Sequence, residues 1–295
     1  MSVVIPAHQE AALIGRILRR IVREDPDGAI EIVVVANGCT DDTAQVAAAV
    51  DPRITVVELA EGSKTAALNA GDRAASAFPR AYVDADVSIS VPTLLALADE
   101  LDRPGGPLVA SPRFHVDTSG ASAAVRAYYR VWALSEYRAT GHIGSGVYAV
   151  SEAGRARWDE FPDVIADDRF VQQRFVPDER ATLERASFTV RAPRTFAAQL
   201  ARATRIHAGN RQLPAAMQVA AQAPASDRYG ALLRRVASRP RLWPAFAVYC
   251  VGYGVPIVRA RIAAALGRTT GWNRDDTVRD DTVRDDTVRT GTVRA

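Results

Sequence analysis

The first part of the chain alternates short runs of β-branched residues with segments whose apolar residues recur at helical spacing. Residues 3–5 and 32–35 are such runs, each bounded by turn residues, a pattern typical of buried strands. Residues 11–23, between them, place aliphatic side chains three or four positions apart, which predicts an amphipathic helix. Strand, helix and strand in this order predict a parallel βαβ unit.

The same alternation continues to about residue 86. It predicts helices at 42–50 and 65–77 and strands at 54–59 and 81–83. Four strands with helical crossovers predict an α/β fold with an open, mostly parallel sheet flanked by helices. Because such sheets bind ligands at the carboxyl ends of their strands, the residues that follow each strand are the first candidates for a site.

Beyond residue 90 the pattern is less regular. The further elements that we expect are helices at 91–101, 121–137, 167–175 and 195–213 and strands at 108–113 and 147–150. We therefore expect a main domain over 1–215 and a helical extension over 216–272. Residues 273–295 repeat Asp-Asp-Thr-Val-Arg three times; a repeat with so few large apolar side chains cannot bury a core, which predicts a disordered tail.

One segment of the extension, residues 242–258, contains no charged residue. Its length is near the lower limit for a helix that crosses a bilayer. Arginines flank it on both sides, so no charge asymmetry sets an orientation. These features favour a packed segment or a peripheral contact with a membrane surface, while a true span stays open as the alternative.

The charge and cysteine content narrow the classes of function. The net charge is only +3 although the pI is about 9.1, and the basic residues are spread along the chain, which argues against nucleic acid as a partner. Cys39 and Cys250 are far apart and indicate neither a disulfide framework nor a zinc site. The first residues lack the features of a secretory signal. We expect a cytoplasmic protein, with the inner face of a membrane as a further option.

Two carboxylates separated by one small residue, Asp84 and Asp86, directly follow the strand predicted at 81–83. Hard divalent cations prefer oxygen ligands and leave coordination positions for phosphate oxygens, so this pair is a candidate site for a metal and a diphosphate. The alternative is an ordinary turn, in which aspartate is common.

Four segments, at residues 3–10, 33–43, 62–71 and 83–86, occur in the order and spacing of the family 2 glycosyltransferases. The chain resembles that family over roughly residues 2–210. The resemblance implies a GT-A fold, a nucleotide-diphosphate sugar as donor, a Mn²⁺ or Mg²⁺ ion, and transfer to an acceptor hydroxyl with inversion. Asp84 and Asp86 would hold the metal, and Asp84 would also contact the donor.

The resemblance also implies donor-binding residues in the first two loops. By their match to the family motifs these are Pro6, Ala7, Glu10 and Asn37. Gln9 stands where the family usually has asparagine, and Asn37 belongs to a pair that is usually more acidic. Asn37 can still offer an amide to a nucleobase.

Lys64 is the only lysine of the chain and stands where a loop opens a helix. Its charge and the helix N-terminus could together bind a donor phosphate. The alternative is a lysine that is simply solvated at the surface.

In the acceptor half, Asp167 and Asp168 match the acidic pair of the family. An inverting transfer needs a general base for the acceptor hydroxyl, and the resemblance assigns this role to Asp168, with Asp167 as its neighbour. The alternative is that these aspartates cap a helix, because aspartate is favoured there.

Residues Gly144, Ser145 and Gly146 resemble the acceptor-site turn of the family, where missing side chains let a sugar approach the backbone; a plain turn is the alternative.

Gln199 and Arg202 partly match a motif of processive members, but Ala203 replaces its tryptophan, which argues against synthesis of long polymers. A lone histidine, His207, is more typical of a structural residue than of a metal ligand.

Two other functions remain open. A nucleotidyltransferase on the same type of fold would use a similar site, although it usually has a glycine-rich and basic loop after the first strand, where this chain has residues 6–10. A module that binds a nucleotide sugar without catalysis is the second alternative. The acceptor, which could be a glycan, a lipid-linked group or a small molecule, is not indicated by the sequence.

Overall fold

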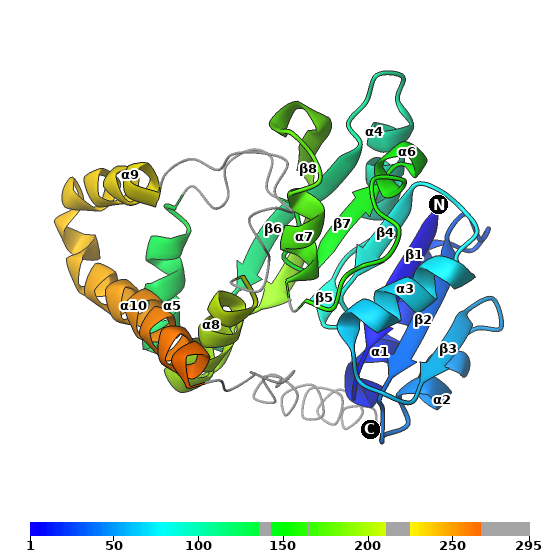
Figure 1. Cartoon of the computed structure of the whole chain (residues 1–295), viewed down its shortest axis with the longest axis horizontal. Helices are drawn as coiled ribbons and strands as arrows, with labels where there is room; N and C mark the ends of the chain where they lie inside the picture. Colours follow the sequence, from blue (N-terminus) through cyan, green and yellow to red (C-terminus); the bar gives the residue numbers. More distant parts are fainter. Residues whose placement is uncertain (136–142, 165, 211–224, 267–295) are drawn as a thin grey trace, which may run out of the picture.

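A computed structural model describes residues 1–135, 143–164, 166–210 and 225–266 of the chain (Figure 1). The strands are β1 (Ser2–Ala7), β2 (Glu31–Asn37), β3 (Thr55–Leu59), β4 (Arg80–Val83), β5 (Val87–Ser88), β6 (Val109–Asp117), β7 (Val147–Val150) and β8 (Arg180–Arg191). The helices are α1 (Ala11–Glu24), α2 (Thr43–Ala48), α3 (Lys64–Ala74), α4 (Val91–Asp102), α5 (Ala123–Trp132), α6 (Glu152–Arg155), α7 (Asp167–Gln172), α8 (Phe196–Asn210), α9 (Ala225–Ala237) and α10 (Trp243–Ala265), with short 3₁₀ turns η2 (Pro177–Glu179) and η4 (Pro240–Leu242). The tail predicted at 273–295 lies outside the described residues.

The eight strands form one sheet in the order β3-β2-β1-β4-β7-β6-β8-β5. The first four strands of this order run parallel, as the βαβ pattern predicts. The strand β7 is antiparallel to both of its neighbours, β6 and β8 are parallel, and β5 is antiparallel to β8. The predicted fold class, a mostly parallel sheet flanked by helices, is confirmed.

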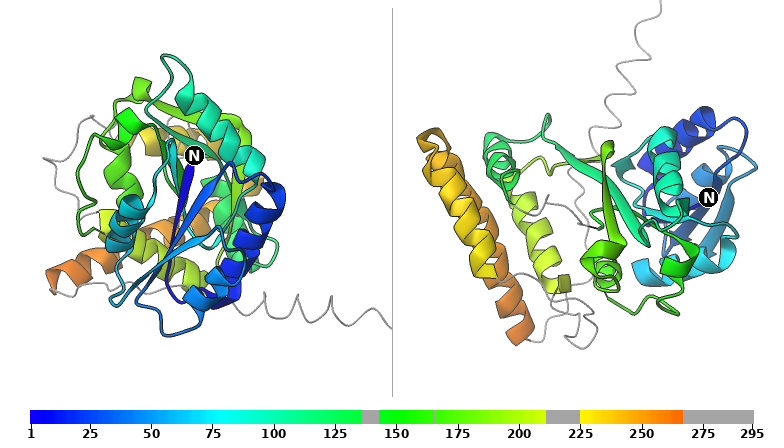
Figure 2. Two further views of the ribbon diagram at one scale, coloured as in Figure 1. Left: turned by 90° about the vertical axis from the view of Figure 1, so that its right-hand side faces the viewer. Right: turned by 90° about the horizontal axis from the view of Figure 1, so that it is seen from above.

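Helices cover both faces of the sheet, so its central strands are apolar on both sides. On one face, α1, α2 and α4 pack against side chains such as Val3, Ile5 and Val34. On the other face, α3 and α7 pack against Val4, Val33 and neighbouring residues. The view along the sheet in Figure 2 shows these helices on its two sides. Burial on both faces explains why β1 and β2 are continuous apolar runs rather than alternating ones.

The position of β7 brings together two segments that are far apart in the sequence. Because β7 is antiparallel to β4, with Val83 opposite Val147, the residues that precede β7 lie beside those that follow β4. The turn at residues 144–146 therefore lies next to Asp84.

A second layer of helices lies at one end of the sheet. The side chains of α5, α9 and α10 form a separate apolar cluster around Tyr128, Leu232 and Tyr249, and α8 packs against α10. Figures 1 and 2 show α9 and α10 as the outermost elements, with α5 and α8 between them and the sheet.

Within the described residues, one helical segment, Pro240–Ala265, is long and apolar enough to cross a membrane by length and composition. This segment includes the uncharged residues 242–258. Only 28% of its most apolar window is buried in the protein.

Two strands were not predicted. The strand β5 has two residues, too few to give a pattern. The strand β8 contains charged side chains over its first half and pairs with β6 through a register shift after Pro112. Apolar and polar residues do not alternate regularly along this strand, so the sequence gives no strand pattern here.

Candidate active site

The two acids that follow β4 lie at the carboxyl edge of the parallel strands. The backbone N–H of Asp84 donates to the carbonyl of Gly146 at 2.8 Å, and its side chain is half-buried. Asp86 is exposed. Although the residue as a whole is exposed, the protein atoms gathered around its carboxyl group raise the pKa of Asp86, and the nearby Asp84 carboxylate raises it further, while Arg202 and Lys64 oppose the rise. Two carboxylates this close to one another are a place where a cation is electrostatically favoured.

Lys64 joins these acids to the pair on α7. Its Nζ lies 2.8 Å from Asp84 Oδ1 and 3.0 Å from Asp167 Oδ1. Burial acts to lower the pKa of the Lys64 ammonium, but the charges of Asp167, Asp84 and Asp168 outweigh this and raise the pKa above its ordinary value. Lys64 is therefore a permanent cation between the two acidic segments and not a solvated surface residue.

Lys64 is held at this point by the first turn of α3. Ser63 is the N-cap residue, and its hydroxyl accepts a hydrogen bond from the backbone N–H of Ala66. A serine in this position is favoured because it satisfies an N–H group that the helix itself cannot pair. The cap fixes where the helix begins and so places Lys64 at its first position.

The acidic pair at Asp167 and Asp168 forms the first turn of α7, whose N-cap residue is Ala166. Neither aspartate is therefore the N-cap residue. Asp167 is buried, and burial raises its pKa to about 6, with the negative charges of Asp168 and Asp84 adding to the shift and Lys64 opposing it. Asp168 is only half-buried, so of the two carboxylates it is the one that solvent and a ligand can reach.

The turn that precedes β7 holds Asp168. The backbone N–H of Ser145 donates to Asp168 Oδ2 at 3.1 Å. All three residues of the turn have positive φ, at 113° for Gly144, 64° for Ser145 and 107° for Gly146. This conformation favours glycine, which explains the glycines at positions 144 and 146. The turn contacts Asp84 through the Gly146 carbonyl and Asp168 through the Ser145 amide.

Ser111 anchors the same turn and was not recognised in the sequence. Its buried hydroxyl accepts a hydrogen bond from the Gly144 N–H at 3.1 Å and donates to the Val147 carbonyl at 2.9 Å. A serine inside a strand gives no signal by itself. Its role depends on β6 lying beside β7.

The residues predicted to bind the donor lie after β1 and β2. Pro6, Ala7, Glu10 and Asn37 are all buried. The Asn37 amide donates to the Ala7 carbonyl at 2.8 Å, and the Glu10 N–H donates to Thr43 Oγ1 at 2.8 Å. In this conformation Asn37 supports the backbone of the first loop and does not present its amide to solvent.

Gln9, which replaces the usual asparagine, fastens the first loop to the second. It has a φ of 55°. Its side-chain amide donates to Thr40 Oγ1 at 2.7 Å, and its Oε1 accepts from the N–H groups of Thr40 and Asp41. The longer side chain thus ties together the two loops at the carboxyl ends of β1 and β2.

The helix α8 contributes one further charge. Arg202 is close enough to Asp86 to lower its pKa. Gln199, three positions earlier, is buried and accepts a hydrogen bond from the Tyr129 hydroxyl at 3.0 Å. Ala203, which replaces a tryptophan of the partial motif, is also buried.

His207 packs edge-on against the Tyr253 ring, with centroids 5.2 Å apart, and burial lowers its pKa.

Among the residues that the structure describes, no group of three or more His, Cys, Asp or Glu side chains is arranged to hold a metal.

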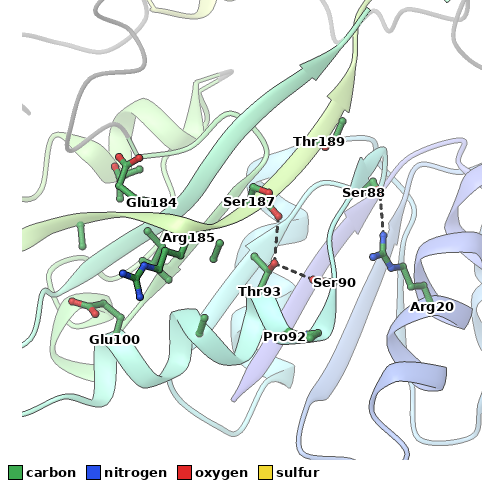
Figure 3. A pocket seen from close by; sticks show the side chains of 15 residues that line it. Arg20, Ser88, Ser90, Pro92, Thr93, Glu100, Glu184, Arg185, Ser187 and Thr189 are labelled. Atoms are coloured by element: carbon green, nitrogen blue, oxygen red, sulfur yellow. Dashed lines mark hydrogen bonds between the residues drawn. The ribbon is translucent and has the colours of Figure 1, made fainter. Parts of the chain in front are cut away.

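A separate groove of about 760 Å³ lies between α4, β5 and β8 (Figure 3). Arg20 donates to Ser88 Oγ at 3.1 Å at one end, and Thr93 Oγ1 donates to the Ser187 carbonyl at 3.3 Å. None of the acids of the candidate site lines this groove.

Removing the charge of Lys64 is expected to destabilise the protein. In Lys64→Met, the buried Asp167 loses its ion pair, and we expect the free energy of unfolding to fall by about 2 kcal/mol at neutral pH. Asp167→Asn in the same chain should recover about half of this loss, because it removes the uncompensated charge. Urea denaturation of the two single variants and the double variant measures this; additive losses in the double variant would contradict the coupling.

Gly144 is expected to be intolerant of a side chain. A Cβ at this position would lie 2.4 Å from Asp168 Cβ and 2.6 Å from its Oδ2, at a φ of 113°. We expect Gly144→Ala to lower the free energy of unfolding by about 3 kcal/mol. Gly105→Ala is the control, because its φ is 69° but nothing lies within 4 Å of the added Cβ; it should cost about 1 kcal/mol. Equal losses in the two variants, measured by urea denaturation, would show that Asp168 does not limit this site.

Comparison with known proteins gives one family and a set of structural neighbours. The family model of glycosyl transferase family 2 matches residues 2–155, which is more than half of the chain. Among curated proteins, no sequence matches significantly.

Several solved structures resemble the chain at low sequence identity. The mannosyltransferase PcManGT from Pyrobaculum calidifontis, solved with GDP-mannose and Mn²⁺, is 22% identical with a TM-score of 0.58, over 98% of this chain and 79% of that one. A mycobacterial protein is 20% identical with a TM-score of 0.50, over 65% and 67% of the two chains. Glucosyl-3-phosphoglycerate synthase from Mycobacterium tuberculosis, solved with Mg²⁺ and UDP, is 23% identical with a TM-score of 0.49, over 65% and 70%. At these identities, the likeness to the first two structures, with TM-scores of 0.58 and 0.50, shows the fold.

Proposed function

Because the chain belongs to glycosyl transferase family 2, we propose that it transfers a sugar from a nucleotide-diphosphate sugar to an acceptor hydroxyl, with inversion and with a divalent cation. One observation carries the proposal. Two acidic pairs from distant parts of the sequence, Asp84 with Asp86 and Asp167 with Asp168, meet at the carboxyl edge of the sheet around Lys64.

The acids after β4 fit a Mn²⁺ or Mg²⁺ ion. Carboxylate oxygens are the ligands that these hard cations prefer, and Mg²⁺ commonly takes one or two carboxylates and completes its coordination with substrate phosphates and water. Asp84 and Asp86 would hold the ion. Bound there, the cation supplies positive charge that stabilises the departing diphosphate. The PcManGT structure, which contains GDP-mannose and Mn²⁺, supports this assignment by analogy.

Asp168 would act as the general base. Its Oδ2 is held by the Ser145 N–H, and the residue is partly open to solvent. The Asp168 carboxylate would take the proton of the acceptor hydroxyl while the acceptor oxygen forms a bond to the anomeric carbon and the bond to the diphosphate breaks. Attack from the side opposite to the leaving group inverts the configuration. Asp167 would remain paired with Lys64 and hold the first turn of α7 in place.

The loops after β1 and β2 would bind the nucleotide. We propose that Pro6, Ala7, Glu10 and Asn37 shape this part of the donor site, with Asn37 acting through its hydrogen bond to Ala7. Lys64 would bind the diphosphate, because it is a cation at the first position of α3 and lies beside Asp84. Residues 144–146 would contact the acceptor, because the turn lies next to Asp168.

We propose a cytoplasmic location for the reaction. Both Cys39 and Cys250 are free thiols in the structure, which fits a reducing compartment.

Calorimetric titration with UDP- and GDP-sugars, with and without Mn²⁺, followed by an assay of donor hydrolysis, tests the proposal. We expect one class of donor to bind only with the cation and to release the nucleoside diphosphate. Release of pyrophosphate from a nucleoside triphosphate and a sugar phosphate would indicate nucleotidyl transfer instead. Binding without turnover, with any acceptor class offered, would indicate a non-catalytic module.

A further inference from the structure

The outer side of α10 carries a stripe of exposed apolar residues. Val251, Val258 and Ile262 are 50%, 54% and 54% exposed, and their spacing of seven and four residues places them on one side of the helix. Trp243 and Leu266, near the two ends, are exposed as well, as is Leu233 of α9. Exposed apolar residues that gather in this way mark an interaction surface.

The inner side of α10 is fully engaged. Ala245, Tyr249, Gly252, Pro256 and Ala260 are its buried residues, and their spacing places them on one side, roughly opposite the apolar stripe. A Cβ on Gly252 would lie 2.6 Å from the Tyr128 ring of α5, so the two helices are in close contact. A helix inserted across a bilayer would have to give up this packing. The structure thus favours a helix that lies along a surface.

Between residues 230 and 266 every charged side chain is positive. Residues 230–266 contain no Asp or Glu and six arginines, all of them exposed: Arg234, Arg235, Arg239, Arg241, Arg259 and Arg261. Arg259 and Arg261 project on either side of the stripe, each roughly 80° from it at 100° per residue. This combination of an apolar stripe with flanking arginines is typical of helices that bind anionic lipid. A second copy of the chain would instead bring arginines against arginines.

We infer that α9 and α10 dock on the surface of an anionic lipid bilayer, with the apolar stripe at the level of the headgroups and the arginines on lipid phosphates. The docked helices do not cross the bilayer. This surface lies outside the acidic cluster, so the inference does not depend on the proposed reaction.

Flotation of the full-length protein with lipid vesicles tests the inference. We expect binding to vesicles of phosphatidylcholine and phosphatidylglycerol and at least roughly tenfold weaker binding to phosphatidylcholine alone. Val258→Glu with Ile262→Glu should weaken binding to the anionic vesicles by roughly tenfold or more. Arg239→Gln with Arg241→Gln should weaken it by roughly twenty-five-fold at low salt, since each arginine near an anionic surface contributes roughly fivefold.

The matched control places the same two charges elsewhere. Leu95 and Val176 are exposed apolar residues outside the C-terminal helices, and Leu95→Glu with Val176→Glu should leave vesicle binding unchanged. Thermal melting followed by circular dichroism establishes that each variant is folded, and the arginine variant tests the surface without placing new charge on the stripe.

Three outcomes would overturn the inference. The first is no binding of the wild type to anionic vesicles, or equal binding of the stripe variant. The second is bound protein that resists extraction by alkaline carbonate, which would indicate a span. The third is a dimer in light scattering that the stripe variant abolishes, which would assign the surface to a second copy of the chain.

Discussion

Asp168→Asn is expected to lower kcat by about 10³-fold, the usual contribution of a general base. Asparagine has the shape of aspartate and can still accept the hydrogen bond from the Ser145 N–H, but it cannot take the proton of the acceptor hydroxyl. Donor binding does not need this proton transfer, so the affinity for the nucleotide sugar should stay within about twofold. Initial rates at saturating donor and acceptor, together with calorimetry of the donor, measure the two quantities separately.

Asp163→Asn is the control for this variant. Asp163 is exposed and lies a few residues before α7, so its loss of charge should leave kcat unchanged. If Asp168→Asn kept as much activity as the control Asp163→Asn, Asp168 would not be the general base. A parallel loss of donor affinity in Asp168→Asn would show a binding role in place of proton transfer.

Asp86→Asn is expected to abolish the cation-dependent part of turnover, a loss of about 10³-fold in kcat/KM, while leaving the fold intact. An amide is a weaker ligand for a hard cation than a carboxylate, and Asp86 is exposed, so its replacement disturbs no core packing. The measurement is the rate of donor turnover over a range of Mn²⁺ concentrations, with thermal melting to verify folding.

Asp102→Asn, at the exposed end of α4, provides the comparison for a lost surface carboxylate and should behave as wild type. Full activity of Asp86→Asn at low Mn²⁺ would remove the metal role from this residue. A rate that recovers at high Mn²⁺ would instead support it, because a weakened site can still be filled by mass action.

Much of the α/β half could be predicted because each element there carries its own local signal. The strands β1 and β2 are continuous apolar runs, and α1 has one apolar side, so neither prediction needs knowledge of distant contacts. The strands β5 and β8 lack such a signal. The pairing of β8 with β6 joins residues about 70 positions apart, and nothing in the composition of either segment specifies it.

The acids of the candidate site could be predicted from the sequence, but the ion pairs that connect them could not. Asp84, Asp86, Asp167 and Asp168 were named from motifs, but the ion pair of Lys64 with Asp167 joins residues about a hundred positions apart, which no local pattern specifies. The hydrogen bond that occupies the Asn37 amide was also unforeseen, since it depends on the register of two parallel strands.

The C-terminal helix shows how local signals can mislead. Two prolines and two glycines between residues 244 and 256 would ordinarily interrupt a helix. Yet α10 runs from Trp243 to Ala265 with Pro256 inside it, because Pro244 lies in the first turn and Gly252 and Pro256 face the neighbouring helices. At Gly252 the close contact with Tyr128 leaves no room for a side chain, so tertiary packing decides the residue here and helix propensity does not.

The three-residue turn before β7 has a consequence for how this enzyme could acquire new acceptors. One of its amides donates to the carboxylate of Asp168, and one of its carbonyls accepts from the backbone N–H of Asp84 at the end of β4. In the proposed reaction, main-chain atoms of this turn would therefore help to fix the base relative to the cation ligands. If the turn contacts the acceptor as proposed, differences in acceptor size would have to be accommodated by the side chains around it.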